Sequence, residues 1–195
     1  KPDMIALTGD IVDEDHDSIS SVEDLLKGIK DLAPIYFVTG NHELTSLAAT
    51  QYQELLALFQ KYGVTDLDND SVKLKKGGQS ITLYGRQYFS QYLTDSLPIA
   101  SDKDFDILLY HGSDNFKEIA PYHYDLILSG HAHGGIVRLP IWGGIFGNDG
   151  TFFPEYAGGE YTIGDATLIS SRGLGDASIP RFNNPPELVV IKLNP

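Results

Sequence analysis

The chain is organised around the stretch Leu126–Gly135, which reads LILSGHAHGG. The apolar run at its start ends at a glycine, a pattern that predicts a buried strand running into a tight turn. His131 and His133 follow two residues apart, and the flanking glycines let the backbone approach a ligand closely. Two imidazoles on a turning backbone can converge on a metal ion. Taken alone, the stretch fits an exposed turn with two histidines equally well.

Three other segments repeat this order of an apolar strand followed by polar residues. The strands that we expect at 4–8, 35–38 and 105–110 run into GDIVD, GNHE and HG respectively. Singly, such residues are ordinary in turns and helix caps. If all four strand ends lie on one edge of the sheet, a carboxylate, an amide and three or four imidazoles converge there. Such a donor set suits borderline divalent metals such as Mn, Fe or Zn.

The remaining pattern predicts an α/β fold. Apolar spacing favours helices at 19–31 and 52–62, and a hairpin turns at Gly77-Gly78. We also expect a short helix at 113–120 with Ser113 as its N-cap, and strands at 161–163, 167–170 and 188–191, the last one buried. Strands alternate with helices in the first part of the chain, and in the last part the strands come in hairpin-like pairs. This order indicates a layered α/β sandwich on a largely mixed sheet.

Length and composition limit the classes of protein that need to be considered. A chain of 195 residues is expected to form one domain, residues 1–195. The absence of cysteine excludes thiolate ligands, and the net charge of −13 argues against nucleic acid as a partner. No apolar run approaches the roughly 18–20 residues that span a bilayer. Both a cytoplasmic and a membrane-associated location stay open.

Together, these motifs resemble the calcineurin-like metallophosphoesterases. The family's blocks Gly-Asp-x-x-Asp, Gly-Asn-His-Asp/Glu, a lone His and Gly-His-x-His occur in order at 9–13, 40–43, 111 and 130–133. The later segments SRGLG (171–175) and RFNNPPE (181–187) look like one bacterial branch, many members of which carry an N-terminal membrane anchor or export signal. The resemblance covers nearly the whole chain and implies an αββα sandwich with mixed sheets.

The resemblance also implies a set of metal ligands. Asp10 would bridge two divalent ions, Asn41, His111 and His131 would complete one site, and His133 would belong to the other. A bridging carboxylate holds two cations about 3.5–4 Å apart, where they can clamp a phosphate and lower the pKa of a shared water.

The catalytic roles come from the same blocks. His42 would stabilise the transition state or protonate the leaving oxygen, and Asp13 would orient it. A histidine held by a carboxylate is a competent acid near neutral pH.

One family block, Asp-x-His, does not occur in these 195 residues. Its place in the family is upstream of Lys1, after the first strand, so we expect an N-terminally truncated chain in which that strand is missing. The second metal site would then keep only Asp10 and His133. From this chain alone we expect weak or no activity.

Other residues have a functional and a structural interpretation. Arg172 and Arg138 could bind phosphate oxygens, although surface salt bridges explain them as well. Glu43 could support the metal ligands from behind, although a solvated residue in a turn or at a helix start is the preferred interpretation, and His123 and His16 read as surface or capping residues. The apolar cluster at 142–153 could line a pocket for an apolar substrate tail or touch a membrane, but a loop folded over its own small core is the preferred interpretation.

The leading hypothesis is therefore a metallophosphoesterase that cleaves phosphoester or pyrophosphate bonds by attack of metal-activated hydroxide at a binuclear centre. Its partner would be a small phosphorylated substrate, with a lipid-linked one among the options, and a missing N-terminal anchor could bring it to a membrane. The alternative is a non-catalytic binding or scaffold protein that keeps the fold with an incomplete metal site. A nuclease is a third option, which the acidic charge opposes. The sequence leaves the substrate, the metal and the oligomeric state open.

Overall fold

The structure is a computed structural model that describes residues 1–13, 18–88, 93, 97–101, 104–147, 150–175 and 180–194. His16 lies outside these ranges. In chain order the elements are β1 (Ile5–Leu7), α1 (Ser18–Ile29), β2 (Ile35–Phe37), α2 (Asn41–Thr45), α3 (Ala49–Tyr62), β3 (Val64–Asp66), β4 (Ser71–Lys76), β5 (Gln79–Arg86), β6 (Phe105–Gly112), the 3₁₀ turn η2 (Ser113–Asn115), α4 (Phe116–Ile119), η3 (Ala120–Tyr122), β7 (Leu126–Gly130), β8 (Val137–Leu139), β9 (Gly143–Phe146), β10 (Gly159–Ile163) and β11 (Ala166–Ser170).

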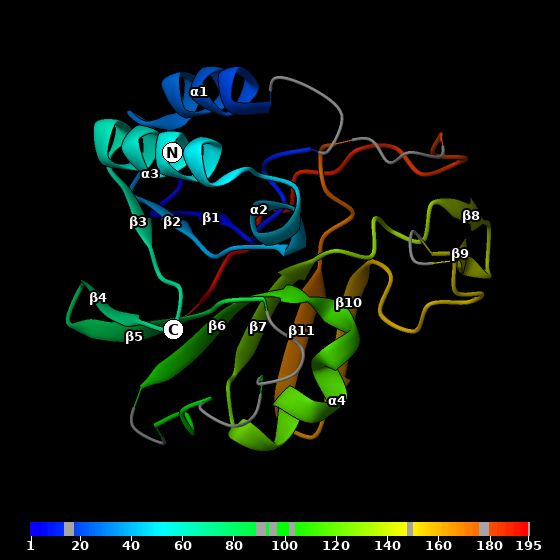
Figure 1. Cartoon of the computed structure of the whole chain (residues 1–195). Helices are drawn as coiled ribbons and strands as arrows, with labels where there is room; N and C mark the ends of the chain where they lie inside the picture. The colour runs from blue at the N-terminus through cyan, green and yellow to red at the C-terminus, as the bar shows by residue number, and fades with distance from the viewer. Residues whose placement is uncertain are drawn as a thin grey trace.

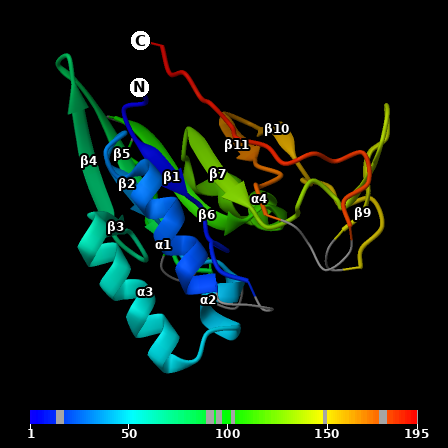
Figure 2. The same ribbon diagram turned by 90° about the horizontal axis from the view of Figure 1, so that it is seen from above.

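Two sheets pack face to face between layers of helices (Figure 1). The smaller sheet is parallel and has the order β1-β2-β3. The larger sheet has the order β10-β11-β7-β6-β5-β4, with a parallel centre and antiparallel strands at both edges. Helices α1 and α3 cover the small sheet in both views (Figures 1 and 2), and Figure 1 shows α4 against the large sheet. The predicted αββα sandwich with mixed sheets is confirmed.

Three apolar cores hold these layers together. One lies between α1, α3 and the small sheet and includes Leu26, Phe37 and Leu55. A second fills the space between the sheets, where Val38 of the small sheet meets residues of β6 and β7. The third joins the large sheet to α4. The middle core is the one that matters for the site, because it fixes the distance between the loops of the two sheets.

Most predicted elements are confirmed, and their ends follow local chemistry. Helix α3 stops at Gly63, which takes the left-handed conformation with φ of 70°. The β4–β5 hairpin turns at Gly77-Gly78, both with positive φ, as a tight two-residue turn requires. The helix expected at 113–120 is divided into η2, α4 and η3, and the residue that caps its start is Gly112 rather than Ser113, which is buried. His123 is the C-cap of η3, in agreement with its capping interpretation.

The strand predicted at 188–191 is wrong. This segment runs extended without pairing to any strand of the described residues, and the side chains of Leu188 and Val190 are 76% and 87% exposed. An apolar run of that length reads as a buried strand, but a strand forms only where a neighbour accepts its backbone hydrogen bonds.

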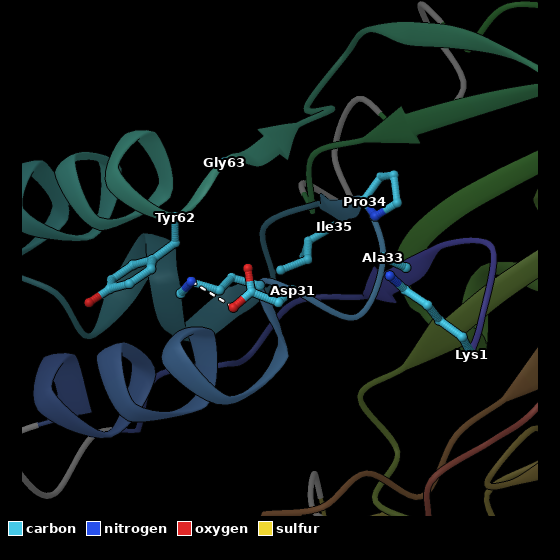
Figure 3. Close-up of a pocket in the computed structure, with 8 residues that line it drawn as sticks. Lys1, Asp31, Ala33, Pro34, Ile35, Tyr62 and Gly63 are labelled. Atoms are coloured by element: carbon cyan, nitrogen blue, oxygen red, sulfur yellow. Dashed lines mark hydrogen bonds and ion pairs between the residues drawn. The ribbon is translucent and has the colours of Figure 1, made fainter.

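No helix within the described part of the chain combines the length and apolar character needed to cross a bilayer. A shallow pocket of about 390 Å³ lies at the amino ends of the small sheet's strands, where Lys1, Asp31, Pro34 and Tyr62 line it (Figure 3). Because the motif residues follow the carboxyl ends of strands, this pocket lies at the opposite edge of the sheet from them.

Candidate metal centre

The four motif loops come together, but not on one edge of one sheet. Strands β1 and β2 of the small sheet supply Asp10 and Asn41, whereas β6 and β7 of the large sheet supply His111 and His131. Within the described residues, Asp10, His111 and His131 each offer a ligand atom, and these atoms lie within 4.8 Å of one another. The site is thus built across the interface of the stacked sheets.

The centre of the cluster is Nε2 of His111, whose side chain is almost fully buried. This atom lies 3.0 Å from Oδ2 of Asp10, 3.1 Å from Oδ1 of Asn41 and 3.1 Å from Nδ1 of His131. The other ring nitrogen, Nδ1, lies 2.7 Å from the carbonyl oxygen of Thr8. A carbonyl oxygen only accepts, so Nδ1 of His111 carries a proton and donates it to Thr8.

That hydrogen bond leaves Nε2 of His111 with a lone pair in the neutral ring, or with one proton in the imidazolium. Nε2 can therefore donate to at most one of its three neighbours. A divalent cation would resolve this crowding, because all four atoms can direct lone pairs at it. Two atoms that are each about 2.1 Å from one cation and lie at a right angle are about 3 Å apart. The distances from Nε2 of His111 to Asp10, Asn41 and His131 are therefore those expected of atoms that bind one cation.

The charges at the cluster are coupled. Burial opposes a charge on both Asp10 and His111, but the hydrogen bond and attraction between them outweigh it. As a result the pKa of Asp10 is lowered and the pKa of His111 is raised. Without a metal, His111 thus tends to hold a proton that it shares with Asp10, and a cation must displace this proton.

We expect metal affinity to fall as the pH drops below the raised pKa of His111, which lies above its ordinary value of about 6.5. Each further pH unit should weaken apparent affinity by about tenfold, because one proton competes with one cation. Competition titrations with Zn²⁺ from about pH 5.5 to 8 measure this slope. Asn41→Ala, which removes a ligand but not the Asp10 charge, should weaken binding with the same slope. A flat pH profile would contradict the expectation.

Close backbone contact brings the β1 and β2 loops together. A Cβ added to Gly40 would lie 2.2 Å from Oδ1 of Asp10, and one added to Gly9 would lie 2.4 Å from the Gly40 nitrogen. Asp10, His131 and His133 have positive φ of 51°, 69° and 49°. Left-handed backbone at non-glycine residues is uncommon and concentrates at functional sites.

Glu43 holds the β1 and β2 loops together through hydrogen bonds. Its interpretation as a solvated residue is wrong. It is 1% exposed and accepts four backbone N–H groups: those of Asp10 (2.9 Å), Ile11 (2.8 Å), Val12 (3.3 Å) and Gly40 (2.7 Å). Burial and the nearby Asp10 charge raise the pKa of Glu43, and the backbone donors oppose this rise. A position on the first turn of α2 looked exposed because nothing local shows the β1 loop folding over it.

His42, the predicted catalytic acid, lies beside the cluster. Its backbone N–H donates to Oδ1 of Asp10 at 2.9 Å, and its Nε2 is 3.8 Å from Oδ2 of the same carboxylate. Oγ of Ser46 lies 3.5 Å from Nδ1 of the ring. Asp13 is exposed at the end of the β1 loop, and its role in orienting His42 stays a prediction.

His133 has different surroundings from His131. Nη2 of Arg181 lies 3.5 Å from Nδ1 of His133, and Asn184 Nδ2 donates to the His133 carbonyl at 2.6 Å. Burial and the Arg181 charge lower the pKa of His133 to about 4, so its ring is neutral at physiological pH. Arg181 lies in the segment RFNNPPE, and no role could be predicted for it from the sequence.

The two arginines predicted to bind substrate are held by internal contacts. Arg172 donates through Nε and Nη2 to Oε2 of Glu187, and Arg138 donates to the carbonyl oxygen of Gly134. Their proposed role toward substrate stays a prediction. Tyr88 is a further residue that the sequence did not reveal: its ring centroid lies 5.2 Å from that of His111 and 5.3 Å from that of His131, so it covers one side of the cluster.

Comparisons with known proteins agree with this geometry. Residues 1–135 match the profile of the calcineurin-like phosphoesterases. The chain is 30% identical to the uncharacterized metallophosphoesterase YkuE of Bacillus subtilis (strain 168), over 99% of this chain and 68% of that protein. It is 27% identical to the phosphodiesterase YaeI of Escherichia coli (strain K12), over 99% of this chain and 71% of that one.

Among solved structures, the sulfate thiohydrolase SoxB of Thermus thermophilus, in complex with glycerol, matches with a TM-score of 0.53 and 16% identity. The match covers 86% of this chain but only 33% of the SoxB chain. At that identity the likeness shows a shared fold and nothing about substrate.

Proposed function

Because this chain belongs to the calcineurin-like phosphoesterase family, we propose that it is a metal-dependent hydrolase of phosphoester or pyrophosphate bonds with a binuclear centre. The observation that carries the proposal is the crowding at Nε2 of His111. Asp10, Asn41 and His131 approach this atom within 3.0–3.1 Å, although it can donate to only one of them. A purely structural histidine has no need of three such neighbours.

The residues divide into two ligand sets. Asp10, Asn41, His111 and His131 would hold one divalent ion, and Asp10 and His133 would contribute to the second. Mn, Fe and Zn all suit this set of imidazole, carboxylate and amide donors. Bound divalent ions supply Lewis acidity, which polarises a phosphoryl oxygen and lowers the pKa of a water.

In this proposal His42 moves the proton. Its backbone is fixed to Asp10 through the 2.9 Å hydrogen bond, while its side chain remains 24% exposed. A partly exposed imidazole at the rim of the cluster can reach a leaving oxygen and exchange a proton with solvent after each turnover. His42 acts in this proposal as the general acid.

The substrate class follows from charge and from the relatives. The net charge of −13 disfavours a long polyanion, so the proposed substrate is a small phosphorylated molecule rather than nucleic acid. The name of YaeI makes a phosphodiester the first choice, ahead of a monoester and a pyrophosphate. Lipid-linked phosphates belong to the same chemical class.

A panel of bis(p-nitrophenyl) phosphate, p-nitrophenyl phosphate and inorganic pyrophosphate tests the proposal with Mn²⁺, Fe²⁺ or Zn²⁺ added. Asp10→Asn is expected to lower the rate on the best substrate by on the order of 10³-fold, since it weakens the only predicted shared ligand. Asp31→Asn is the matched control: it makes the same change in the pocket of Figure 3, on the opposite edge of the sheet, and should leave the rate unchanged.

A non-catalytic binding protein is the second candidate, and one observation favours it. The guanidinium of Arg181 lies 3.5 Å from Nδ1 of His133, and its positive charge opposes a second cation beside this ring. Stoichiometric metal binding without turnover of any phosphoester or pyrophosphate, measured on a protein that carries an Asp-x-His block ahead of Lys1, would support this alternative and overturn the hydrolase.

A further inference from the structure

The β8–β9 hairpin and the segment that returns along it form a lobe, described over residues 137–147 and 150–154, that projects from the side of the sandwich in both views (Figures 1 and 2). Its large apolar side chains face solvent. Ile141 and Trp142, in the hairpin turn, are fully and 70% exposed, and Phe152 and Phe153 are 72% and 57% exposed. The expected loop folded over its own small core is therefore wrong for these residues.

The lobe is held in place rather than loosely attached. Strands β8 and β9 pair with each other, Phe153 donates its N–H to Ile145 at 2.8 Å, and the rings of Phe146 and Phe152 pack at 5.4 Å. At the base of the lobe, a Cβ on Gly135 would lie 2.8 Å from the Gly144 Cα. The backbone of β9 therefore packs closely against the loop that carries His131 and His133. The exposed side chains are thus presented on a defined support.

The backbone is strained where these apolar side chains are exposed. Ile141 has φ of 75°, a conformation that is sterically unfavourable for a β-branched residue. No burial of the side chain offsets this cost, because Ile141 is fully exposed. Phe153 also has positive φ, at 55°. Strain of this kind concentrates where a side chain has a function.

The charge distribution indicates which partner suits the lobe. Asp149 is the only charged residue in the sequence from Leu139 to Pro154, in a chain that is 21% charged with a net charge of −13. An acidic protein is repelled by an anionic surface, and the lobe carries no cationic side chain in that stretch to reverse this. A projecting tip of Ile, Trp and Phe has the composition of a segment that enters the interfacial region of a bilayer.

We propose that the tip of this lobe, formed by Ile141, Trp142, Phe152 and Phe153, docks onto the surface of a zwitterionic lipid bilayer. Because β8 begins a few residues after His133, docking would hold the metal centre close to that surface. The inference concerns binding alone and stands whether or not the protein is a hydrolase.

Trp142 is the single tryptophan of the chain, so intrinsic fluorescence reports directly on the tip. With phosphatidylcholine vesicles we expect a blue shift of the emission, and quenching when the lipid carries bromine on its acyl chains. Ile141→Ser should weaken vesicle binding by about tenfold, since it removes an apolar side chain that would be buried in lipid. Ile99→Ser makes the same change at an isoleucine that lies outside the lobe and is 70% exposed, and it should have no effect.

The proposal is overturned if vesicles leave the emission unchanged or if Ile141→Ser and Ile99→Ser weaken binding equally. Binding confined to vesicles that contain anionic lipid would also overturn it, because it would indicate another surface. A blue shift that grows with protein concentration in the absence of lipid would assign the tip to contact with a second copy of the chain. Circular dichroism and Zn²⁺ binding of each variant verify that the fold is intact.

Discussion

Replacing Glu43 by alanine is expected to lower the free energy of unfolding by about 3–5 kcal/mol. The Glu43 carboxylate accepts the N–H groups of Asp10, Ile11, Val12 and Gly40, and alanine leaves all four without that acceptor in a buried place. Urea unfolding of the metal-free protein measures the effect, and a fall in melting temperature of about 10 °C should accompany it.

Two further variants distinguish the contribution of the carboxylate to stability from that of side-chain size. Glu43→Gln keeps the size but points an NH₂ group at two N–H donors, so it should still cost about 2 kcal/mol. Glu54→Ala is the matched control, because Glu54 is exposed on α3 and its loss should change stability by less than about 0.5 kcal/mol. Equal stability of the Glu43→Ala and Glu54→Ala proteins would show that Glu43 does not stabilise the β1 and β2 loops.

The same variant should also weaken metal binding at temperatures where it stays folded. Glu43 holds the backbone of Asp10 and Gly40, and these residues position two of the four predicted ligands of one ion. Displacement of a ligand loop by the loss of a supporting hydrogen bond typically lowers metal affinity by about 10–100-fold. Unchanged Zn²⁺ affinity in Glu43→Ala would show that Glu43 contributes to stability alone.

The sequence predicted the layers and most of the elements because local signals determine them. Apolar runs that end at glycine identify β1, β2, β6 and β7, and the helical spacing of apolar residues identifies α1 and α3. β3 was missed because its three residues are largely exposed and too short to show a period. The segment 188–191 was misassigned because composition reveals strand propensity but not the presence of a pairing partner.

For the site, the sequence revealed the residue types but not the contacts. Strand ends indicated Asp10, Asn41, His111 and His131, yet their meeting point lies between two stacked sheets rather than on one edge. Glu43 and Tyr88 could not be found this way. Tyr88 carries no motif, and Glu43 closes the GNHE block, which does not show that its carboxylate accepts the backbone of the distant β1 loop.

The metal ion at His131 is expected to be retained more strongly than any ion at His133. His131 lies in a group with Asp10 and Asn41, and each of the three has a ligand atom 3.0–3.1 Å from Nε2 of His111. His133 instead faces the guanidinium of Arg181 at 3.5 Å, and that positive charge repels a cation. After extensive dialysis against metal-free buffer, elemental analysis should find about one equivalent of metal per chain.

Alanine variants at the two positions give the sharpest comparison, since His131 and His133 lie two residues apart on one loop. His131→Ala should lower the affinity of the retained ion by about 10²-fold or more, whereas His133→Ala should leave it nearly unchanged. Arg181→Gln removes the positive charge beside His133, so it should increase the metal bound at saturation toward two equivalents. Equal losses in His131→Ala and His133→Ala would contradict this division, because both histidines would then hold the same ion or two ions of equal strength.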